Sequence, residues 1–292
     1  MDLGGLGMRW DGNRESDNVE DRRGERGGGG GGAFGIGAVL IGLVAWLVFD
    51  VNPITVINLI SEMEPAAEQQ APARASAPDD RDAKFIRVML ADTEDVWRPL
   101  LQAQGERYRP PKLVMFTGAT PTACGRGDAA IGPFYCPGDE KIYIDLSFFQ
   151  TLGRELGAPG EFAQAYVIAH EVGHHVQHQL GISAKVDEEM ARSDERRAKA
   201  LSVRQELQAD CLAGVWGHHA DQARRILEPG DLETALTAAA RIGDDALQRS
   251  AGREVVPDSF THGSGEQRVR WFRRGFDSGD MAQCDTFRAR RL

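Results

Sequence analysis

Aromatic residues are scarce in this sequence, and positive charge is in the minority. Phenylalanine, tyrosine and tryptophan make up 7% of the 292 residues, and 44 acidic side chains outnumber 34 lysines and arginines, which gives a formal net charge of −10. No stretch interleaves basic with aromatic residues. Proteins that bind DNA or RNA carry a basic surface, so we expect no nucleic-acid partner.

Cysteine is also scarce, and its spacing excludes one kind of metal site. The four cysteines are Cys124, Cys136, Cys211 and Cys284, and no C-x-x-C pair occurs, which disfavours a four-cysteine zinc site. An even number in an exported domain indicates two disulfides. Cys124 and Cys136 flank a glycine-containing loop, which favours a local bond and leaves Cys211 for Cys284. Spacing alone permits three connectivities.

Only one long segment combines apolar character with a lack of charge. Residues 33–49 are short for a transmembrane helix, but neighbouring glycines or residues 51–60 can extend them. No lysine or arginine follows until Arg74. The arginines that precede the segment are Arg9, Arg14, Arg22, Arg23 and Arg26. The positive-inside rule then predicts a single-pass inner-membrane anchor over residues 33–50, with the N-terminus cytoplasmic and the remainder exported. A buried core helix is the alternative.

This anchor divides the chain into unequal parts. Residues 1–32 are polar, carry both signs of charge and end in glycines, so we expect a disordered cytoplasmic segment. Residues 51–81 are rich in Ala, Pro, Glu and Gln and are typical of a flexible linker. The Ala-Ser-Ala triplet at 75–77 lies too far from the apolar run for a signal-peptide site, which favours an uncleaved anchor. Residues 82–292 are long enough for one domain.

Two histidines one helical turn apart form the main motif. His170 and His174 lie in residues 162–180, whose apolar positions recur at helical spacing, so one helix face presents both imidazoles to a common point. Two neutral imidazoles bind Zn²⁺, the ion lowers the pKa of a bound water, and the Glu171 carboxylate accepts its proton. Gly173 costs about 1 kcal/mol against alanine inside a helix, which indicates close packing there. Surface or core histidines are the alternative.

A catalytic zinc site needs a third protein ligand and one open position. His175 is rotated by about 100° from His174 and points elsewhere. Glu206 and Asp210 are four residues apart and share a face of a second predicted helix that continues into an apolar stretch. Glu206 is predicted to be the third ligand, and Asp210 to accept the free N–H of a ligand imidazole. A solvated acidic face is the alternative.

Residues 162–177 together with 205–216 resemble the bacterial neutral zinc metallopeptidases, a family of membrane-anchored proteins of the gluzincin type. The resemblance extends over most of the chain. It implies a zincin-like catalytic domain with the ligand set above and Glu171 as the base. The expected fold class is therefore α+β and mostly helical, a zincin-like metallopeptidase domain with a small N-terminal β-sheet, preceded by a single transmembrane helix.

Residues 112–116 and 141–145 are predicted strands, and residues 82–105 and most of the chain after 187 are predicted helices. In zincin folds a strand at the sheet edge ahead of the motif helix binds an extended substrate by backbone pairing. Residues 142–145 fit that role, with an ordinary core strand as the equal alternative.

Near the C-terminus, His262 precedes a glycine-containing turn and a basic amphipathic helix. Gluzincins often stabilise the oxyanion of the tetrahedral intermediate with a late His, Tyr or Arg. We therefore interpret His262 as catalytic, with Arg268 assisting. A capping or buried structural histidine and a salt-bridged arginine are the alternatives.

The favoured function is a membrane-anchored zinc endopeptidase that hydrolyses peptide bonds of a peptide or protein substrate. Two rivals stay open. One is a zincin-fold envelope protein that binds partners without turnover, and the intact Glu171 weighs against it because a structural zinc needs no adjacent base. The other is a metal-dependent hydrolase of a non-peptide substrate, such as a cell-wall component.

Overall fold

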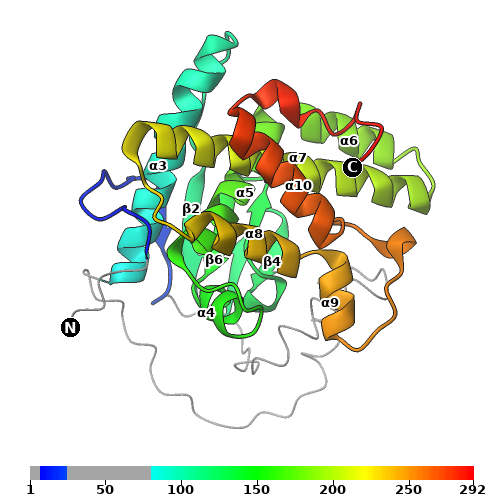
Figure 1. The fold of residues 1–292 in the computed structure, drawn as a ribbon, viewed down its shortest axis with the longest axis horizontal. Helices are drawn as coiled ribbons and strands as arrows, with labels where there is room; N and C mark the ends of the chain where they lie inside the picture. Colours follow the sequence, from blue (N-terminus) through cyan, green and yellow to red (C-terminus); the bar gives the residue numbers. More distant parts are fainter. Residues whose placement is uncertain (1–6, 25–79) are drawn as a thin grey trace.

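The computed structural model describes residues 7–24 and 80–292 (Figure 1). The predicted anchor, residues 33–50, and nearly all of the predicted linker, residues 51–81, lie outside these ranges. Within them, no helix is both long enough and apolar enough to span a bilayer. The described chain is mixed α and β, mostly helical with a small sheet, which confirms that part of the expected fold class.

Two central helices lie against each other, and each contributes many residues to the core. α5 packs on α7, α10 packs on α7 from the other side, and α3 contacts both α5 and α7 (Figure 1). The helices are α3 (Arg81–Ala103), α4 (Ser147–Arg154), α5 (Glu161–Gln179), α6 (Ile182–Met190), α7 (Glu195–Arg224), α8 (Asp231–Arg241), α9 (Asp244–Ser250) and α10 (Gly265–Ser278). The 3₁₀ turns are η1 (Ala129–Ile131), η2 (Pro257–Ser259) and η3 (Met281–Cys284).

The main sheet has four strands in the order β1-β2-β6-β5. Its strands are β1 (Val19–Asp21), β2 (Lys112–Phe116), β5 (Phe134–Cys136) and β6 (Lys141–Asp145). β1, β2 and β6 are parallel, whereas β5 runs antiparallel to β6. A separate hairpin pairs β3 (Ala119–Thr122) with β4 (Gly125–Asp128).

Both predicted strands, 112–116 and 141–145, are confirmed with these bounds. The edge role considered for residues 142–145 is wrong, because β6 is hydrogen-bonded on both sides and is an interior strand. The edge on that side is β5, a three-residue strand inside the glycine- and proline-containing loop. So short a strand gives no periodic signal, which is why the sequence did not reveal it.

The central strands alternate between two apolar clusters. Leu113 and Ile142 belong to the main core together with the helices, while Val114 and Tyr143 belong to a smaller cluster on the opposite face. Successive side chains of a strand point to opposite faces, so this two-sided burial explains the nearly continuous apolar runs of β2 and β6.

Glycines let the central helices approach closely. A Cβ added at Gly173 of α5 would lie 3.0 Å from the carbonyl oxygen of Ala209 on α7. One added at Gly275 of α10 would lie 1.9 Å from the carbonyl oxygen of Cys211, also on α7. Real Cβ atoms essentially never come nearer than 3.0 Å, so the α7–α10 contact requires glycine at position 275. The close packing expected at Gly173 is confirmed.

The N-terminal residues 7–24 are part of the folded domain. Met8 and Trp10 are buried in the main core, and Val19–Asp21 pair with β2. The expectation that residues 1–32 are disordered is therefore wrong for the part that the structure describes. Composition misled here because the burial partners of this polar segment lie far along the chain.

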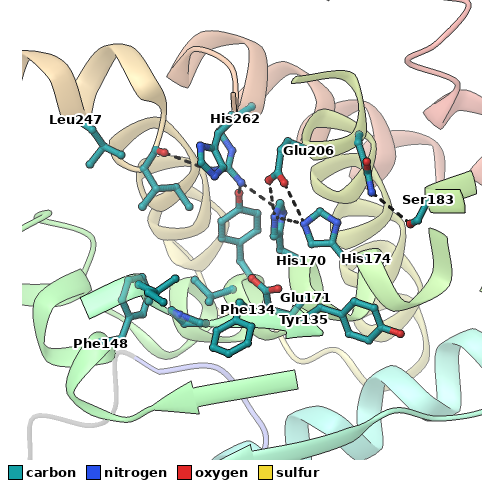
Figure 2. Close-up of a pocket in the computed structure, with 18 of the residues that line it drawn as sticks. Phe134, Tyr135, Phe148, His170, Glu171, His174, Ser183, Glu206, Leu247 and His262 are labelled. Atoms are coloured by element: carbon teal, nitrogen blue, oxygen red, sulfur yellow. Dashed lines mark hydrogen bonds and ion pairs between the residues drawn. The ribbon is translucent and has the colours of Figure 1, made fainter. Parts of the chain in front are cut away.

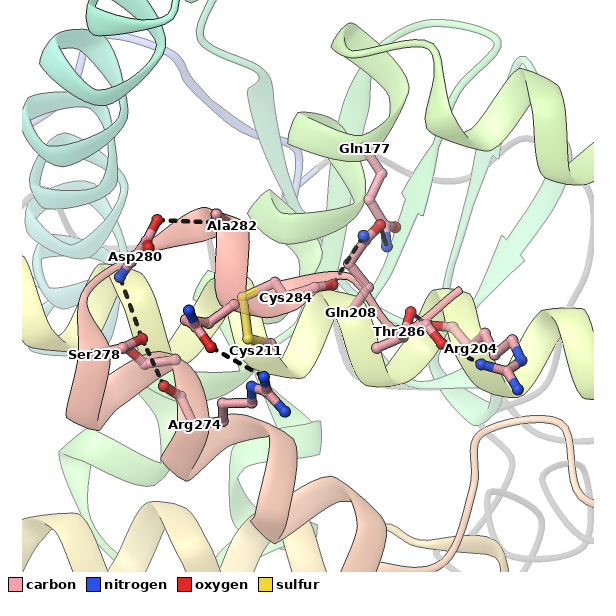
Figure 3. Close-up of a disulfide and its surroundings, with 12 residues drawn as sticks. Gln177, Arg204, Gln208, Cys211, Arg274, Ser278, Asp280, Ala282, Cys284 and Thr286 are labelled. Carbon is pink, nitrogen blue, oxygen red and sulfur yellow. Dashed lines mark hydrogen bonds between the residues drawn. A yellow bond between two sulfur atoms is a disulfide. The ribbon is translucent and has the colours of Figure 1, made fainter. Parts of the chain in front are cut away.

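Both disulfides form as expected, Cys124–Cys136 and Cys211–Cys284. The second bond fastens the C-terminal tail to α7 (Figure 3). Next to it, Gln208 Nε2 donates to the carbonyl oxygen of Cys284. The loop that this bond closes spans 73 residues, for which chain entropy gives a stabilisation of about 4 kcal/mol.

His175 lies on the side of α5 away from the other motif histidines, as its rotation predicted. Its ring is fully buried, donates from Nε2 to the carbonyl oxygen of Arg109 at 2.6 Å and accepts at Nδ1 from the Tyr135 hydroxyl at 3.0 Å. This geometry suits the neutral imidazole. Burial accordingly lowers the pKa of His175 to about 4.

This buried imidazole makes the fold sensitive to mild acid. Between pH 6.5 and 4, His175 binds a proton in the unfolded chain but not in the folded one. The contribution of the neutral imidazole to the free energy of unfolding is therefore complete above pH 6.5 and is lost as the pH falls through 4. The expected loss is about 3 kcal/mol. Urea unfolding at pH 7 and pH 4.5 should show a smaller pH effect in His175→Gln than in the parent or in His178→Gln. An equal pH effect in all three chains would contradict this assignment.

Candidate metal centre

Three side chains from two helices converge on one point of the cleft (Figure 2). His170 Nε2 lies 3.2 Å from His174 Nε2 and 3.2 Å from Glu206 Oε2. His174 Nε2 lies 3.4 Å from Glu206 Oε1. In the described part of the chain, this is the group of His, Cys, Asp and Glu residues close enough to hold a metal ion. The contact of α5 with α7 at Gly173 brings the three donors together.

The donor triangle fits a zinc ion. Nitrogen and oxygen ligands bind zinc at about 2.0–2.1 Å in a tetrahedron, which separates neighbouring donors by about 3.3 Å. The two imidazole nitrogens are 3.2 Å apart, and each lies 3.2 or 3.4 Å from a different oxygen of Glu206, close to this value. Two imidazoles and one carboxylate are also a donor set of catalytic zinc sites, which leave the fourth position open. The described geometry therefore allows His170, His174 and Glu206 to hold the ion.

Each imidazole is held by a second hydrogen bond at its far nitrogen. His170 Nδ1 lies 2.9 Å from Asp210 Oδ1, and His174 Nδ1 lies 2.9 Å from Gln177 Oε1. Gln177 in turn donates to the backbone oxygen of Gln205 on α7. Both acceptors favour the tautomer whose Nε2 lone pair faces the cleft, as metal ligation needs. The position expected for Asp210 is thus observed, whereas the contribution of Gln177 was missed.

Asp210 is the centre of a buried polar cluster. Its carboxylate accepts from the Tyr166 hydroxyl at 2.5 Å and from Arg268 Nε and Nη2, both at 2.8 Å. Burial alone would raise the pKa of Asp210, but Arg268 and His170 hold it at about 2. Arg268 therefore forms a salt bridge, the alternative that the sequence left open for it. Its partner Asp210 is also the hydrogen-bond partner of His170.

The carboxylates of Asp210 and Glu206 also affect the protonation of His170. Burial alone would lower the pKa of His170, but Asp210 and Glu206 raise it to about 10. Burial alone would raise the pKa of Glu206, but His174 and His170 hold this pKa well below its usual range. A metal ion that binds here must displace a proton from the imidazole, so binding is coupled to pH.

Glu171 and His262 both line the cleft beside the ligands. Glu171 is 7% exposed, and burial raises its pKa, so its carboxylate accepts a proton more readily than a solvated one. His262 faces the same cleft from the loop before α10, where Asp244 Oδ1 lies 3.2 Å from its Nδ1 (Figure 2). The structure thus brings both predicted catalytic residues to the cleft that holds the ligand triangle.

The cleft has a volume of about 380 Å³ and two unlike walls. The α5–α7 wall carries the charged groups just described. The opposite wall includes Phe134 and Tyr135 of the edge strand β5, and Phe148 and Leu247 lie at one end (Figure 2). An apolar recess next to a polar triangle is the usual composition of a site for an organic ligand.

Comparisons with known proteins agree with this geometry. The model of a family described as "Putative neutral zinc metallopeptidase" matches residues 8–287. The uncharacterized protein YpfJ of Escherichia coli K12 is 52% identical over 284 residues, which are 96% of this chain and 99% of that protein. The uncharacterized protein Rv2575 of Mycobacterium tuberculosis H37Rv is 40% identical over 220 residues, 70% of this chain and 72% of the relative. No solved structure matches the chain.

Removal of the third donor tests the triangle. Glu206→Ala leaves two imidazoles, so we expect metal loss on dialysis against a weak chelator while the parent keeps one zinc per chain. Glu266→Ala, which removes an exposed carboxylate from α10, is the matched control and should keep its zinc. Elemental analysis gives the stoichiometry, and undiminished zinc in Glu206→Ala would remove this residue from the site.

Proposed function

Because the chain belongs to the neutral zinc metallopeptidase family, we propose that it is a zinc-dependent peptidase that cleaves within polypeptide chains. The observation that carries the proposal is Glu171 beside the donor triangle of His170, His174 and Glu206. A zinc ion held there would polarise the scissile carbonyl and lower the pKa of a water. A zinc site with a purely structural task has no use for such a base.

The side chains of this protein then divide the work. Glu171 accepts the proton of the attacking water at its carboxylate and later donates it to the leaving amine. Asp210 and Gln177 hold the two imidazoles in their ligating tautomers. Burial alone would lower the pKa of His262, but Asp244 and Glu206 raise it. The raised pKa favours the imidazolium form, which can donate a hydrogen bond to the oxyanion of the tetrahedral intermediate.

Substrate binding is assigned to the edge strand. Among the described residues, β5 pairs with β6 and is the last strand of the sheet, and its residues Phe134 and Tyr135 line the cleft. A polypeptide added as a further strand would pair with the outer edge of β5 and pass across the ligand triangle. Disulfide Cys124–Cys136 ends in this strand and fixes it to the β3–β4 turn.

The protein is proposed to act outside the cytoplasm, attached to the membrane through the apolar residues 33–49. Two disulfides support an oxidising compartment. A non-catalytic envelope scaffold with the same fold is the second candidate. The cleft next to Glu171 disfavours it, because a scaffold needs neither the base nor the recess.

Substitution of the base separates catalysis from metal binding. Glu171→Gln keeps the shape of the side chain but cannot accept a proton, so we expect kcat to fall by about 10²- to 10⁴-fold with zinc retained. Glu161→Gln, on the same helix and away from the cleft, should keep parental activity. Cleavage of a denatured protein by the full-length chain in detergent, with zinc measured on the same samples, decides the matter. Full activity of Glu171→Gln would refute this role.

The apolar end of the cleft predicts the substrate side chain. Phe148 and Leu247 lie there, so we expect preferred cleavage next to a large apolar residue. Phe148→Ala should lower kcat/KM for peptides with leucine or phenylalanine at that position by about tenfold, since each lost apolar contact costs 1–3 kcal/mol. Peptides with alanine there serve as the control and should change little. A peptide-library profile that favours charged residues would contradict this prediction.

A further inference from the structure

Residues 7–24, here called the N-terminal arm, dock on the domain that holds the metal site. The backbone N–H of Arg9 donates to the oxygen of Ile226 at 2.7 Å, and that of Ser16 donates to the oxygen of Arg87 at 3.0 Å. β1 adds a parallel ladder with β2, and Trp10 is 2% exposed. The arm therefore contributes both backbone pairing and core side chains.

A buried carboxylate makes this docking specific. Glu94 of α3 is 3% exposed, and its oxygens accept hydrogen bonds from Ser16 at 2.5 Å, from Asn18 at 2.9 Å and from Arg14 at 2.9 Å. All three donors belong to the arm. A buried carboxylate is costly unless such partners satisfy it, so the domain surface around Glu94 is built to hold the arm.

The chain leaves the arm and returns to the domain at the same place. Arg23, next to the last described residue of the arm, forms an ion pair with Asp80. Asp80 is the N-cap of α3 and the first described residue after the gap. Whatever path residues 25–79 follow, both of their ends lie beside this ion pair.

Such an ion pair is incompatible with one membrane crossing between its partners. A single span places its ends on opposite faces of a hydrocarbon layer about 30 Å thick. Two of the arginines that predicted a cytoplasmic N-terminus form ion pairs with the domain: Arg9 pairs with Glu228, and Arg14 with Glu94 and Asp95. Their charge is balanced by the domain, which weakens their value as topology signals.

We propose that the arm and the metal site share one extracytoplasmic compartment, so that the chain between Arg23 and Asp80 crosses the membrane an even number of times or not at all. The two disulfides place the domain in an oxidising compartment, and the docked arm must be there with it. This topology replaces the expected cytoplasmic N-terminus and holds whether or not the domain is a peptidase.

Labelling of single added cysteines tests the topology in the full-length chain. All four native cysteines are in disulfides, so an added cysteine is the one free thiol. Asp17→Cys places it at an exposed site of the arm, and Glu155→Cys at an exposed site after α4. Spheroplasts of an E. coli host that expresses each variant are treated with a membrane-impermeant maleimide before or after lysis. A cytoplasmic thiol protein in the same cells controls for leakage.

We expect Asp17→Cys and Glu155→Cys to be labelled to the same extent in intact spheroplasts, with no gain after lysis. Labelling of Asp17→Cys only after lysis, with Glu155→Cys open before it, would overturn the proposal in favour of a single crossing. Protection of both until lysis would overturn the extracytoplasmic assignment. Non-reducing peptide mapping of both native disulfides verifies that each variant is folded, and this readout does not depend on catalytic activity.

Discussion

The close contact of α5 with α7 is the constraint on which the rest of the molecule depends. At Gly173 the two backbones approach until a Cβ would reach 3.0 Å from the oxygen of Ala209. Helices held that closely place Glu206 within 3.4 Å of the Nε2 atoms of His170 and His174. A larger residue at position 173 would press the helices apart and open the donor triangle. The candidate metal site is thus a consequence of helix packing.

A second contact fixes the orientation of the site. α10 packs on α7 through Gly275, and this brings Arg268 onto the buried Asp210. The two carboxylate oxygens of Asp210 are hydrogen-bond partners of Arg268, Tyr166 and His170. Removal of the arginine would leave a buried charge without its partner, which typically costs 3–5 kcal/mol. The geometry of the candidate site and the stability of the fold therefore depend on the same cluster.

Sequence reasoning found the local features and the distant Cys211–Cys284 disulfide, but it missed the edge strand β5 and the docking of the arm. His170 and His174 lie four residues apart on one helix, so helical geometry alone predicted their common face. Strands 112–116 and 141–145 carry strong apolar patterns and were found with their bounds. The edge strand β5 has three residues and no period, so only its pairing defines it. The arm is polar, and its partners lie elsewhere in the chain, so composition suggested disorder.

The central claim is that two imidazoles and one carboxylate from α5 and α7 bind a zinc ion with one position open. X-ray absorption at the zinc edge of the purified full-length chain tests it most directly. The account predicts one zinc per chain with nitrogen and oxygen neighbours at about 2.0–2.1 Å and the scattering pattern of two imidazoles. Zinc absent from carefully purified protein, or a shell of sulfur neighbours at about 2.3 Å, would contradict it.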